Sequence, residues 1–268
     1  MYALSTRMSR WWYRYAWLLF AISTVAAEAD TAALRRRQLQ DTAEEDNSDS
    51  AQEIDLEPEH HSKACQSVHP LSKNAFDLNS YVEKSWFVQK QQVNPYQGED
   101  ALFCVVATYK TRADGYVQVL NSANRGSVDG EEIRPNQDDF FTQLCAEQLS
   151  GGKLRVGPCL LNLVADLIHG PYWVLAVGEN YSWAIVSAGA PDQYRKTVSG
   201  GKNLCTTSSS TCFLDINGSG LWLFTREQEA SDETISIMMA TLRELGVYAG
   251  DLKDVAQTGC TYPDYIKT

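Results

Sequence analysis

Short runs of aromatic and β-branched residues, separated by turn-forming residues, are the feature of this chain that most restricts its fold. Gly, Pro and Asn positions separate most of these runs, which cover residues 86–88, 102–109, 116–120, 154–164, 172–177, 181–187 and 221–225. Asp114-Gly115 lies between two of them, where Asp-Gly is a strong signal for a β-hairpin. About eight short strands with few helical patterns favour an all-β sandwich or barrel.

A helical pattern follows the last of these strands. Apolar residues recur at helical spacing at Ile235, Met238, Met239, Leu242 and Leu245. Ser231 is a suitable N-cap, acidic residues occupy the first turn, and Gly246 stops the pattern. We therefore expect one α-helix packed outside the sheet and a short final strand over residues 252–258.

The N-terminal residues have the pattern of a secretory signal peptide. Arg7, Arg10 and Arg14 precede an apolar run over residues 16–22, and small residues with an Ala-x-Ala ending follow it. The run is shorter than the roughly 18–20 apolar residues of a membrane-spanning helix. Residues 1–27 are therefore predicted to be a signal peptide. The mature protein is predicted to be secreted, extracellular and without an integral membrane segment.

Residues 28–64 are predicted to form an acidic, disordered tail before a barrel domain over residues 65–268. Residues 38–62 hold nine acidic residues and no Lys or Arg, and a segment of this kind has too little apolar surface to fold. Arg35-Arg36-Arg37 is a candidate processing site that would make residues 28–37 a propeptide. Residues 37–46 resemble a degenerate form of the Arg-x-Leu-Arg leader and acidic run of secreted oomycete effectors. The alternative is a plain acidic spacer.

The net charge of the chain argues against one class of partner, the nucleic acids. The formal charge of the chain is −11, whereas a general nucleic-acid-binding protein needs a basic surface that displaces counterions. No nucleic-acid partner is therefore predicted.

Several motifs along the strands resemble those of the lipocalin family. Residues 76–81 and Trp86-Phe87 are similar to the first motif of the family, although Lys84 stands where that motif has glycine. Residues 104–121 are similar to the second strand pair. Three further segments match well, namely residues 170–176, 181–186 and 221–226.

The resemblance is closest to the branch that contains apolipoprotein D and the bacterial and temperature-induced lipocalins. It implies an eight-stranded antiparallel up-and-down β-barrel, with one C-terminal α-helix packed outside it. It also implies that the barrel binds a small hydrophobic ligand. The oligomeric state does not follow from it.

Alternation of side chains along a strand selects the residues that face the barrel interior. One face of the strand 221–226 carries Trp222, Phe224 and Arg226. On the strand 102–109, Cys104 faces the opposite way from Tyr109. The predicted ligand-binding residues are Trp222, Phe224, Tyr109, Ala107, Val105 and Val88. The alternative is that these side chains only fill a core.

The resemblance also assigns a structural role at the closed end of the barrel. It implies that Arg226 lies across the indole of Trp86, which would form a cation–π contact.

Seven cysteines behind a signal peptide indicate disulfide bonds, with one cysteine left over. The resemblance implies one bond directly, between Cys104 and Cys260. It also implies a bond from Cys65 to a cysteine after the strand 181–187, where a Gly/Ser-rich insertion over residues 189–219 holds Cys205 and Cys212. Either could pair with Cys65, or the two could pair with each other. Cys145 and Cys159 flank another insertion and could pair locally.

Motifs of catalysis and metal binding are sparse. The sequence has no Cys-x-x-Cys, no phosphate-binding loop, no Gly-x-Ser-x-Gly and no His-Glu-x-x-His. His169 follows the pattern of an ordinary loop histidine. We therefore expect no metal, no cofactor and no catalytic residues. The sequons at Asn180 and Asn217 lie in expected turns and are candidate glycosylation sites.

Three functions are consistent with these observations. The first is a non-enzymatic carrier of a lipid, sterol, retinoid or carotenoid. The second is a lipocalin-type isomerase or de-epoxidase, which would need Tyr109 or an unpaired cysteine inside the barrel. The third is an interaction protein directed towards a host, which the acidic leader suggests.

The predicted independence of the tail is testable by truncation. A chain that begins at Ser62 should keep the thermal midpoint of the mature protein, because residues 28–61 have little apolar surface with which to pack. Differential scanning calorimetry of the two chains measures this. A midpoint lower by more than about 5 °C, a shift of roughly 2 kcal/mol in a domain of this size, would show that the tail docks on the barrel.

Overall fold

The computed structural model describes residues 63–94, 97–134, 143–160, 168–207, 220–262 and 266–267. The chain divides into two units, and every described residue belongs to the second, His61–Thr268. The predicted signal peptide, the acidic tail up to residue 62, Cys212 and the Asn217 sequon lie outside the described residues.

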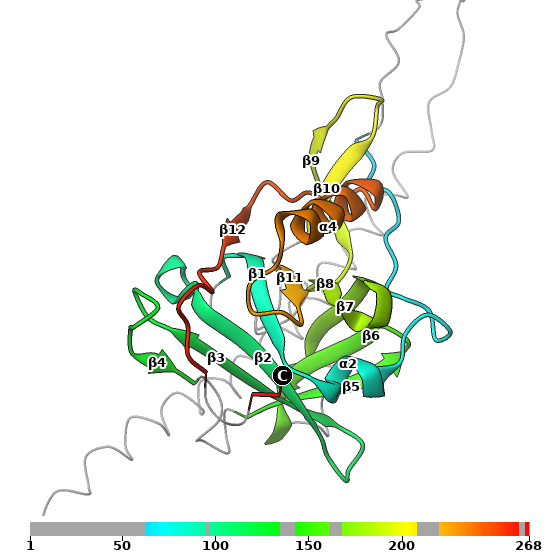
Figure 1. Cartoon of the computed structure of the whole chain (residues 1–268). Helices are drawn as coiled ribbons and strands as arrows, with labels where there is room; N and C mark the ends of the chain where they lie inside the picture. Colours follow the sequence, from blue (N-terminus) through cyan, green and yellow to red (C-terminus); the bar gives the residue numbers. More distant parts are fainter. Residues whose placement is uncertain are drawn as a thin grey trace, which may run out of the picture. The chain divides into compact units, whose positions relative to one another are not determined.

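The described part is built mainly from β-strands (Figure 1). The strands are β1 (Trp86–Gln92), β2 (Phe103–Thr111), β3 (Val117–Asn124), β4 (Glu132–Ile133), β5 (Leu144–Ser150), β6 (Lys153–Pro158), β7 (Gly170–Val177), β8 (Trp183–Ser187), β9 (Pro191–Thr197), β10 (Asn203–Thr207), β11 (Leu221–Thr225) and β12 (Leu252–Asp254). The helices are α2 (Leu78–Glu83) and α4 (Asp232–Glu244), with 3-10 turns η1 (Glu99–Ala101) and η3 (Glu179–Tyr181).

Eight strands close into one antiparallel barrel. They pair in the order β1, β2, β3, β5, β6, β7, β8 and β11, and β11 then pairs with β1. Each strand follows its predecessor in the ring, which is the up-and-down topology. Because each of these strands has a neighbour on both sides, the barrel has no open sheet edge. The predicted fold is confirmed.

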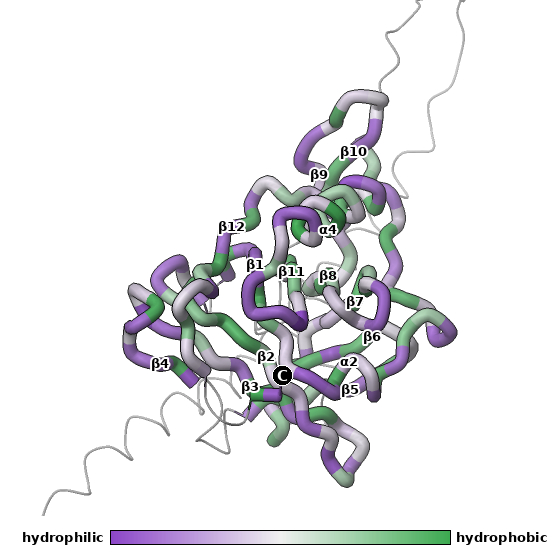
Figure 2. The backbone as a smooth tube through the Cα atoms, in the orientation of Figure 1, coloured by the Kyte–Doolittle hydropathy of each residue, from purple (hydrophilic) through white to green (hydrophobic). Residues whose placement is uncertain are grey.

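The two faces of the barrel wall belong to different apolar clusters. On β11, Trp222 and Phe224 pack in the interior cluster, whereas Leu221 and Leu223 pack in an outer cluster with Met238 of α4. Figure 2 shows hydrophobic residues along β8 and β11, and hydrophilic ones at the tip of the β2–β3 hairpin. Strand alternation therefore puts one set of side chains inside the barrel and the other set beneath α4.

The outer helix begins and ends as the sequence predicts. The Ser231 side chain accepts a hydrogen bond from the N–H of Thr234 at 3.1 Å. Gly246, just beyond α4, has a φ of +74°, a left-handed conformation that glycine adopts without strain. Met238 and Leu242 are fully buried against the barrel wall.

Several strand predictions need correction. The final strand, β12, ends at Asp254 instead of residue 258. β8 begins at Trp183 instead of residue 181, because Asn180 and Tyr181 have left-handed backbones in a turn. β6 ends at Pro158 instead of 164, and residues 161–167 lie outside the described residues. β5 was not predicted, because its outer half, including Gln148, is polar and carries no clear apolar alternation.

The predicted Gly/Ser-rich insertion contains a regular hairpin. β9 and β10 form their own two-stranded antiparallel sheet, and Gly200 and Gly201 make the turn with positive φ angles. The outward residues of β9 are polar, so its sequence does not show a strand pattern. Cys205 ties the hairpin to the chain after α4, because its N–H donates to the Gly246 carbonyl at 2.9 Å.

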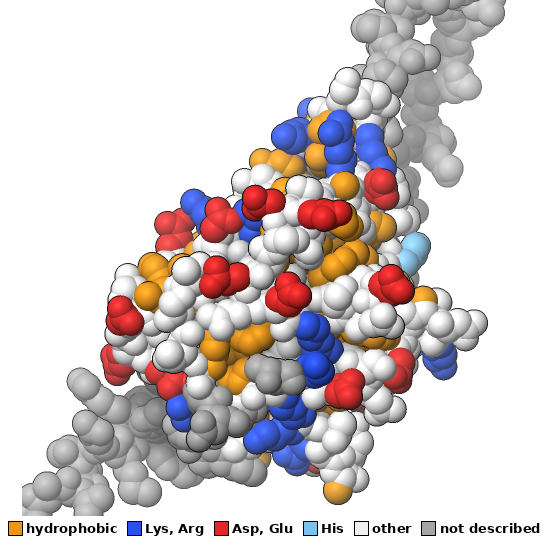
Figure 3. Space-filling view, in the orientation of Figure 1, with side chains coloured by type: hydrophobic (Ala, Val, Ile, Leu, Met, Phe, Trp, Pro, Cys, Tyr) orange, Lys and Arg blue, Asp and Glu red, His pale blue; other side chains and the backbone are white. Residues whose placement is uncertain are grey.

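Charged groups are unevenly distributed on the face in Figure 3. Acidic side chains lie over α4 and β12, whereas Lys and Arg side chains gather over the β9–β10 hairpin. Arg195 and Lys196 are exposed on this hairpin. Arg195 pairs with Asp251 at 2.9 Å, so one basic group of the hairpin contacts the acidic region before β12.

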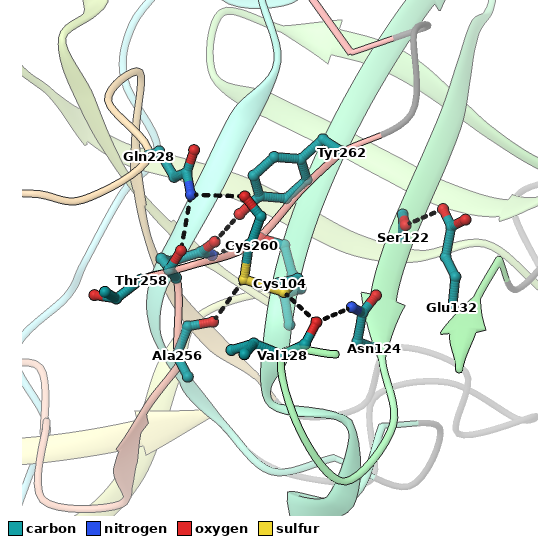
Figure 4. Close-up of a disulfide and its surroundings, with 12 residues drawn as sticks. Cys104, Ser122, Asn124, Val128, Glu132, Gln228, Ala256, Thr258, Cys260 and Tyr262 are labelled. Atoms are coloured by element: carbon teal, nitrogen blue, oxygen red, sulfur yellow. Dashed lines mark hydrogen bonds between the residues drawn. A yellow bond between two sulfur atoms is a disulfide. The ribbon is translucent and has the colours of Figure 1, made fainter. Parts of the chain in front are cut away.

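The C-terminal segment fills a gap in the barrel wall. β1 pairs with β2 only at Trp86 and Phe87, and beyond this point β12 pairs with β1 instead. The N–H of Cys104 then donates to the Ala256 carbonyl at 2.8 Å. Gln257 lies between β1 and β2, and its Nε2 donates to the carbonyls of Val88 and Val105 at 2.8 and 2.9 Å. Figure 4 shows the Cys104–Cys260 disulfide that fixes this segment to β2.

Three disulfides are present, and they include the bond implied by the resemblance. Cys104 pairs with Cys260, Cys65 with Cys205, and Cys145 with Cys159. Of the alternatives left open by the sequence, Cys65 takes Cys205, and Cys145 pairs locally across the β5–β6 hairpin. The remaining cysteine, Cys212, lies outside the described residues.

The two disulfides of the barrel should differ in their effect on stability. Cys104–Cys260 spans 156 residues and Cys145–Cys159 spans 14. In the loop-entropy model these bonds are worth about 5 and about 3 kcal/mol respectively. The double variant Cys104→Ser/Cys260→Ser should therefore unfold at lower urea concentration than Cys145→Ser/Cys159→Ser, while both keep a β-type circular dichroism spectrum. An equal or reversed order of the midpoints would contradict this account of the C-terminal segment.

Candidate functional site

The closed end of the barrel is built around Arg226. Its guanidinium carbon lies 3.5 Å from the centre of the Trp86 ring, which is fully buried. The guanidinium also donates to five backbone carbonyls, those of Ser80 (2.9 Å), Tyr81 (3.0 Å), Lys84, Ser85 (3.1 Å) and Tyr181 (3.2 Å). Burial lowers the pKa of Arg226 to about 10, so the group stays charged at neutral pH. The contact implied by the resemblance is present.

The glycine missing from the first motif is not needed here. Lys84 has a φ of −120° and a ψ of 163°, an extended conformation that any residue adopts. The preceding helix, α2, is capped by Asp77, which accepts hydrogen bonds from the N–H groups of Asn79 and Ser80. The Trp86 indole N–H donates to the Tyr81 carbonyl at 2.9 Å. These contacts hold α2 across the closed end without a left-handed residue.

Three tyrosine hydroxyls form a hydrogen-bonded cluster above this base. The hydroxyl of Tyr172 lies 2.6 Å from that of Tyr81 and 2.7 Å from that of Tyr109. Burial raises the pKa of Tyr109 to about 12, and it raises the pKa values of Tyr81 and Tyr172 well above the ordinary value. The three groups are therefore neutral hydroxyls at physiological pH.

The structure places all six predicted ligand-binding residues in the interior cluster. Trp222, Phe224, Tyr109, Ala107, Val105 and Val88 are buried there together. They lie at different depths. Phe224 stacks on Trp86 with ring centres 6.1 Å apart, and Tyr109 lies 5.7 Å from Tyr81, so both border the closed end. Trp222 is two residues farther along β11, roughly 7 Å beyond Phe224 at the usual rise of a strand.

Small side chains line most of the remaining interior. Apart from the aromatic residues, the cluster consists mainly of alanine and valine, including Ala107, Ala123, Ala146, Ala184, Ala188, Val105, Val117, Val119, Val156, Val174 and Val186. An eight-stranded barrel is just wide enough to hold side chains or one small ligand. Small residues on several strands favour the binding of a small ligand, because they occupy less of the barrel interior than large side chains would.

Gln91 is an interior residue that the sequence analysis missed. The pairing of β1 with β11 shifts between Val88 and Lys90, so that Lys90 stands opposite Leu223 and Gln91 opposite Trp222. If side chains alternated strictly between the two faces of β1 from Val88 onwards, Lys90 would face the barrel interior and Gln91 would face outwards. No signal in the sequence marks this β-bulge, since it depends on the pairing of two distant strands.

Other candidate residues have ordinary surroundings. His169 is buried, with its Nε2 3.3 Å from the Pro158 carbonyl, and burial lowers its pKa. Asn180 is exposed in its turn. Within the described ranges, no group of three or more His, Cys, Asp or Glu side chains could hold a metal ion. No helix in the same residues has both the length and the apolar character that a membrane span requires.

The tyrosine cluster predicts a loss of stability at alkaline pH. Unfolded tyrosine ionises near pH 10, whereas folded Tyr109 keeps its proton up to about pH 12. The unfolded state therefore loses protons first, and this residue alone should remove about 2 kcal/mol of stability between pH 10 and pH 12. Tyr109→Phe should flatten this fall in urea titrations. Tyr194→Phe, on β9, is the control, and an unchanged slope in Tyr109→Phe would contradict the prediction.

Comparisons with known proteins agree with the family resemblance over part of the chain. A family model described as "Lipocalin-like domain" matches residues 85–195, which run from the residue before β1 into β9. No curated protein sequence matches the chain.

Several solved structures are similar to this one. The major allergen Per a 4 from cockroaches is 14% identical, with 73% of this chain and 96% of that chain covered and a TM-score of 0.46. Lobster apocrustacyanin A1 is 12% identical, with 74% and 93% covered and a TM-score of 0.45. Apocrustacyanin C1 is 14% identical, with 69% and 82% covered and a TM-score of 0.44. Residues 85–195, which the lipocalin-like family model matches, build most of the closed barrel.

Proposed function

We propose that this protein is a secreted carrier that binds a small hydrophobic molecule, without covalent attachment, inside its barrel. The observation that carries the proposal is the composition of the interior. The barrel is closed at one end by Trp86, Tyr81 and Arg226, and its remaining interior is lined mainly by alanine and valine with Trp222 on one wall. Such an interior is apolar, shielded and bounded at one end, as binding sites for apolar ligands are.

The driving force for binding is the burial of apolar surface. Transfer of apolar surface from water stabilises a complex by roughly 25 cal/mol per Å², so a ligand that buries about 300 Å² gains roughly 7 kcal/mol before the costs of association. A lipid, sterol, retinoid or carotenoid has enough apolar surface for this. The resemblance to the apolipoprotein D branch supports the same ligand classes.

Secretion is supported by the cysteines together with the predicted signal peptide. Six of the seven cysteines form three disulfides. Disulfides persist mainly in oxidising compartments, which is consistent with an extracellular protein.

An enzymatic function has less support. Tyr109, the inward residue that a lipocalin-type enzyme would use, has a pKa raised to about 12 by burial. Its hydroxyl therefore keeps its proton at neutral pH, and it is hydrogen-bonded to the hydroxyl of Tyr172. The candidate for an unpaired thiol, Cys212, lies outside the described residues. We therefore propose a binding protein instead of an enzyme. The alternative function, an interaction protein directed towards a host, rests on residues 37–46, which also lie outside the described residues.

Substitutions at two neighbouring positions of β11 test the carrier function. The uncharged fluorescent probe N-phenyl-1-naphthylamine should bind the protein and quench its tryptophan fluorescence. Trp222→Phe should weaken the quenching, with the remainder coming from Trp86 in the same interior, and should keep a measurable affinity, because an aromatic wall remains. Trp222→Glu should bind at least tenfold more weakly, because a carboxylate in an apolar interior is desolvated or must take up a proton.

Leu223→Ala is the matched control, since Leu223 faces the outer cluster beneath α4. It should lower stability and leave the dissociation constant within about threefold. Equal losses of affinity at positions 222 and 223 would indicate general unfolding. Failure of the probe and of all tested lipids, retinoids and sterols to bind the wild-type protein would refute the carrier function.

A further inference from the structure

Gln91 presents an amide to the barrel interior beside the proposed ligand wall. Its partner across the β1–β11 ladder is Trp222, and residues directly opposite each other in an antiparallel pair project to the same face. Trp222 belongs to the interior cluster. Gln91 is fully buried, at 0% exposure.

Neither polar atom of the Gln91 side chain has a hydrogen-bond partner, although both are buried. The other glutamines around it are paired. Gln92 donates to the Thr206 hydroxyl at 3.1 Å, and Gln89 donates to the Thr225 hydroxyl at 2.8 Å. Gln257 spans the carbonyls of Val88 and Val105. Gln91 thus differs from these three glutamines, and a buried amide with both ends unpaired opposes folding.

The β-bulge that turns Gln91 inwards is itself well anchored. Gln89 Nε2 also donates to the Gln228 carbonyl at 2.9 Å, and its Oε1 accepts the Ala230 N–H at 3.3 Å. On the outer face, Lys90 pairs with Asp254. The inward direction of Gln91 is therefore fixed by contacts on both sides of the bulge, and the amide cannot turn outwards without breaking them.

We propose that Gln91 binds the polar end of the ligand, and that this ligand is an uncharged apolar molecule with a terminal hydroxyl group. This inference rests on the proposed carrier function. A primary amide has a donor and an acceptor, and a hydroxyl can serve both. The apolar remainder of the ligand would lie against Trp222, which is directly opposite on β11.

The surrounding charges favour an alcohol over a fatty-acid anion. Among the described residues, the buried polar side chains include no Lys, Arg, Asp or Glu. Arg226 and Lys267, two cations at the closed end with nitrogen atoms close to the interior tyrosines, already donate to backbone carbonyls. Lys253, directly opposite Gln91 on β12, is already paired with Glu99 at 3.1 Å. A carboxylate beside Gln91 would therefore be desolvated without an unpaired positive charge to compensate it, whereas a hydroxyl carries no charge to desolvate.

The test compares three ligands that share one hydrocarbon chain. Hexadecan-1-ol, its methyl ether and hexadecanoate at pH 8 are used to displace N-phenyl-1-naphthylamine from the full mature protein. The wild-type protein should bind the alcohol about three- to tenfold more tightly than the ether, which cannot donate, because one neutral hydrogen bond is at stake. Hexadecanoate should bind more weakly than the alcohol.

Gln91→Met, which keeps the length of the side chain, should abolish the preference for the alcohol, measured as the ratio of the alcohol and ether affinities in the same variant. Gln92→Leu is the matched control, because Gln92 is the next residue and bonds to Thr206; it should keep the preference. Without ligand, the thermal midpoint of Gln91→Met should equal or exceed that of the wild-type protein, whereas Gln92→Leu should lower it.

The outcomes separate this inference from the carrier function. If the probe binds but alcohol and ether bind equally to the wild-type protein, the role of Gln91 is refuted and the carrier function stands. The same holds if Gln91→Met retains the preference, or if it melts several degrees lower, as a structural hydrogen-bonding residue would. If the probe and all three ligands fail to bind the wild-type protein, the role of Gln91 is refuted, and the carrier function is refuted with it when the retinoids and sterols also fail to bind.

Discussion

The stacking of Arg226 on Trp86 is the contact on which the closed end of the barrel depends. One guanidinium covers a buried indole and binds five carbonyls from three separate segments, the end of α2, the start of β1 and the turn before β8. Because a guanidinium offers five N–H donors in a rigid plane, lysine could not replace it. The aromatic layer of Tyr81, Tyr109 and Phe224 packs above this base. Without the base, this end of the barrel interior would be open.

The opposite part of the barrel depends on a chain segment from the far end of the sequence. β1 and β2 separate after Phe87, and residues 252–257 occupy the space between them. The Gln257 side chain donates hydrogen bonds to carbonyls of both strands, and the Cys104–Cys260 disulfide fixes the segment in place. The same region contains the bulge that exchanges the directions of Lys90 and Gln91. The wall that borders the proposed ligand is therefore assembled from β1, β11 and β12 together, and its chemistry follows from their combined register.

The interior divides into two chemical zones. Near the closed end, three tyrosine hydroxyls satisfy one another and remain protonated, so this zone is polar but internally paired. Farther along, alanine and valine predominate, and among the described residues the amide of Gln91, opposite Trp222, has neither its donor nor its acceptor paired. A paired cluster stabilises the folded chain by itself, whereas an unpaired amide gains a partner only from a bound molecule. This difference is the reason why we assign the tyrosines to structure and Gln91 to ligand binding.

The sequence by itself determined the features that depend on local periodicity. The inward direction of Trp222, Phe224, Val105, Ala107 and Tyr109 followed from alternation along single strands, and the limits of α4 followed from Ser231 and Gly246. The motif resemblance supplied the closed barrel and the Cys104–Cys260 bond. Only the tertiary structure decided the rest. The direction of Gln91, the partner of Cys65, the tyrosine cluster and the β9–β10 hairpin all depend on pairing between distant segments. A shift of one residue in such pairing reverses which side chains face the interior. The sequence of one strand does not indicate such a shift, because the shift depends on the partner strand.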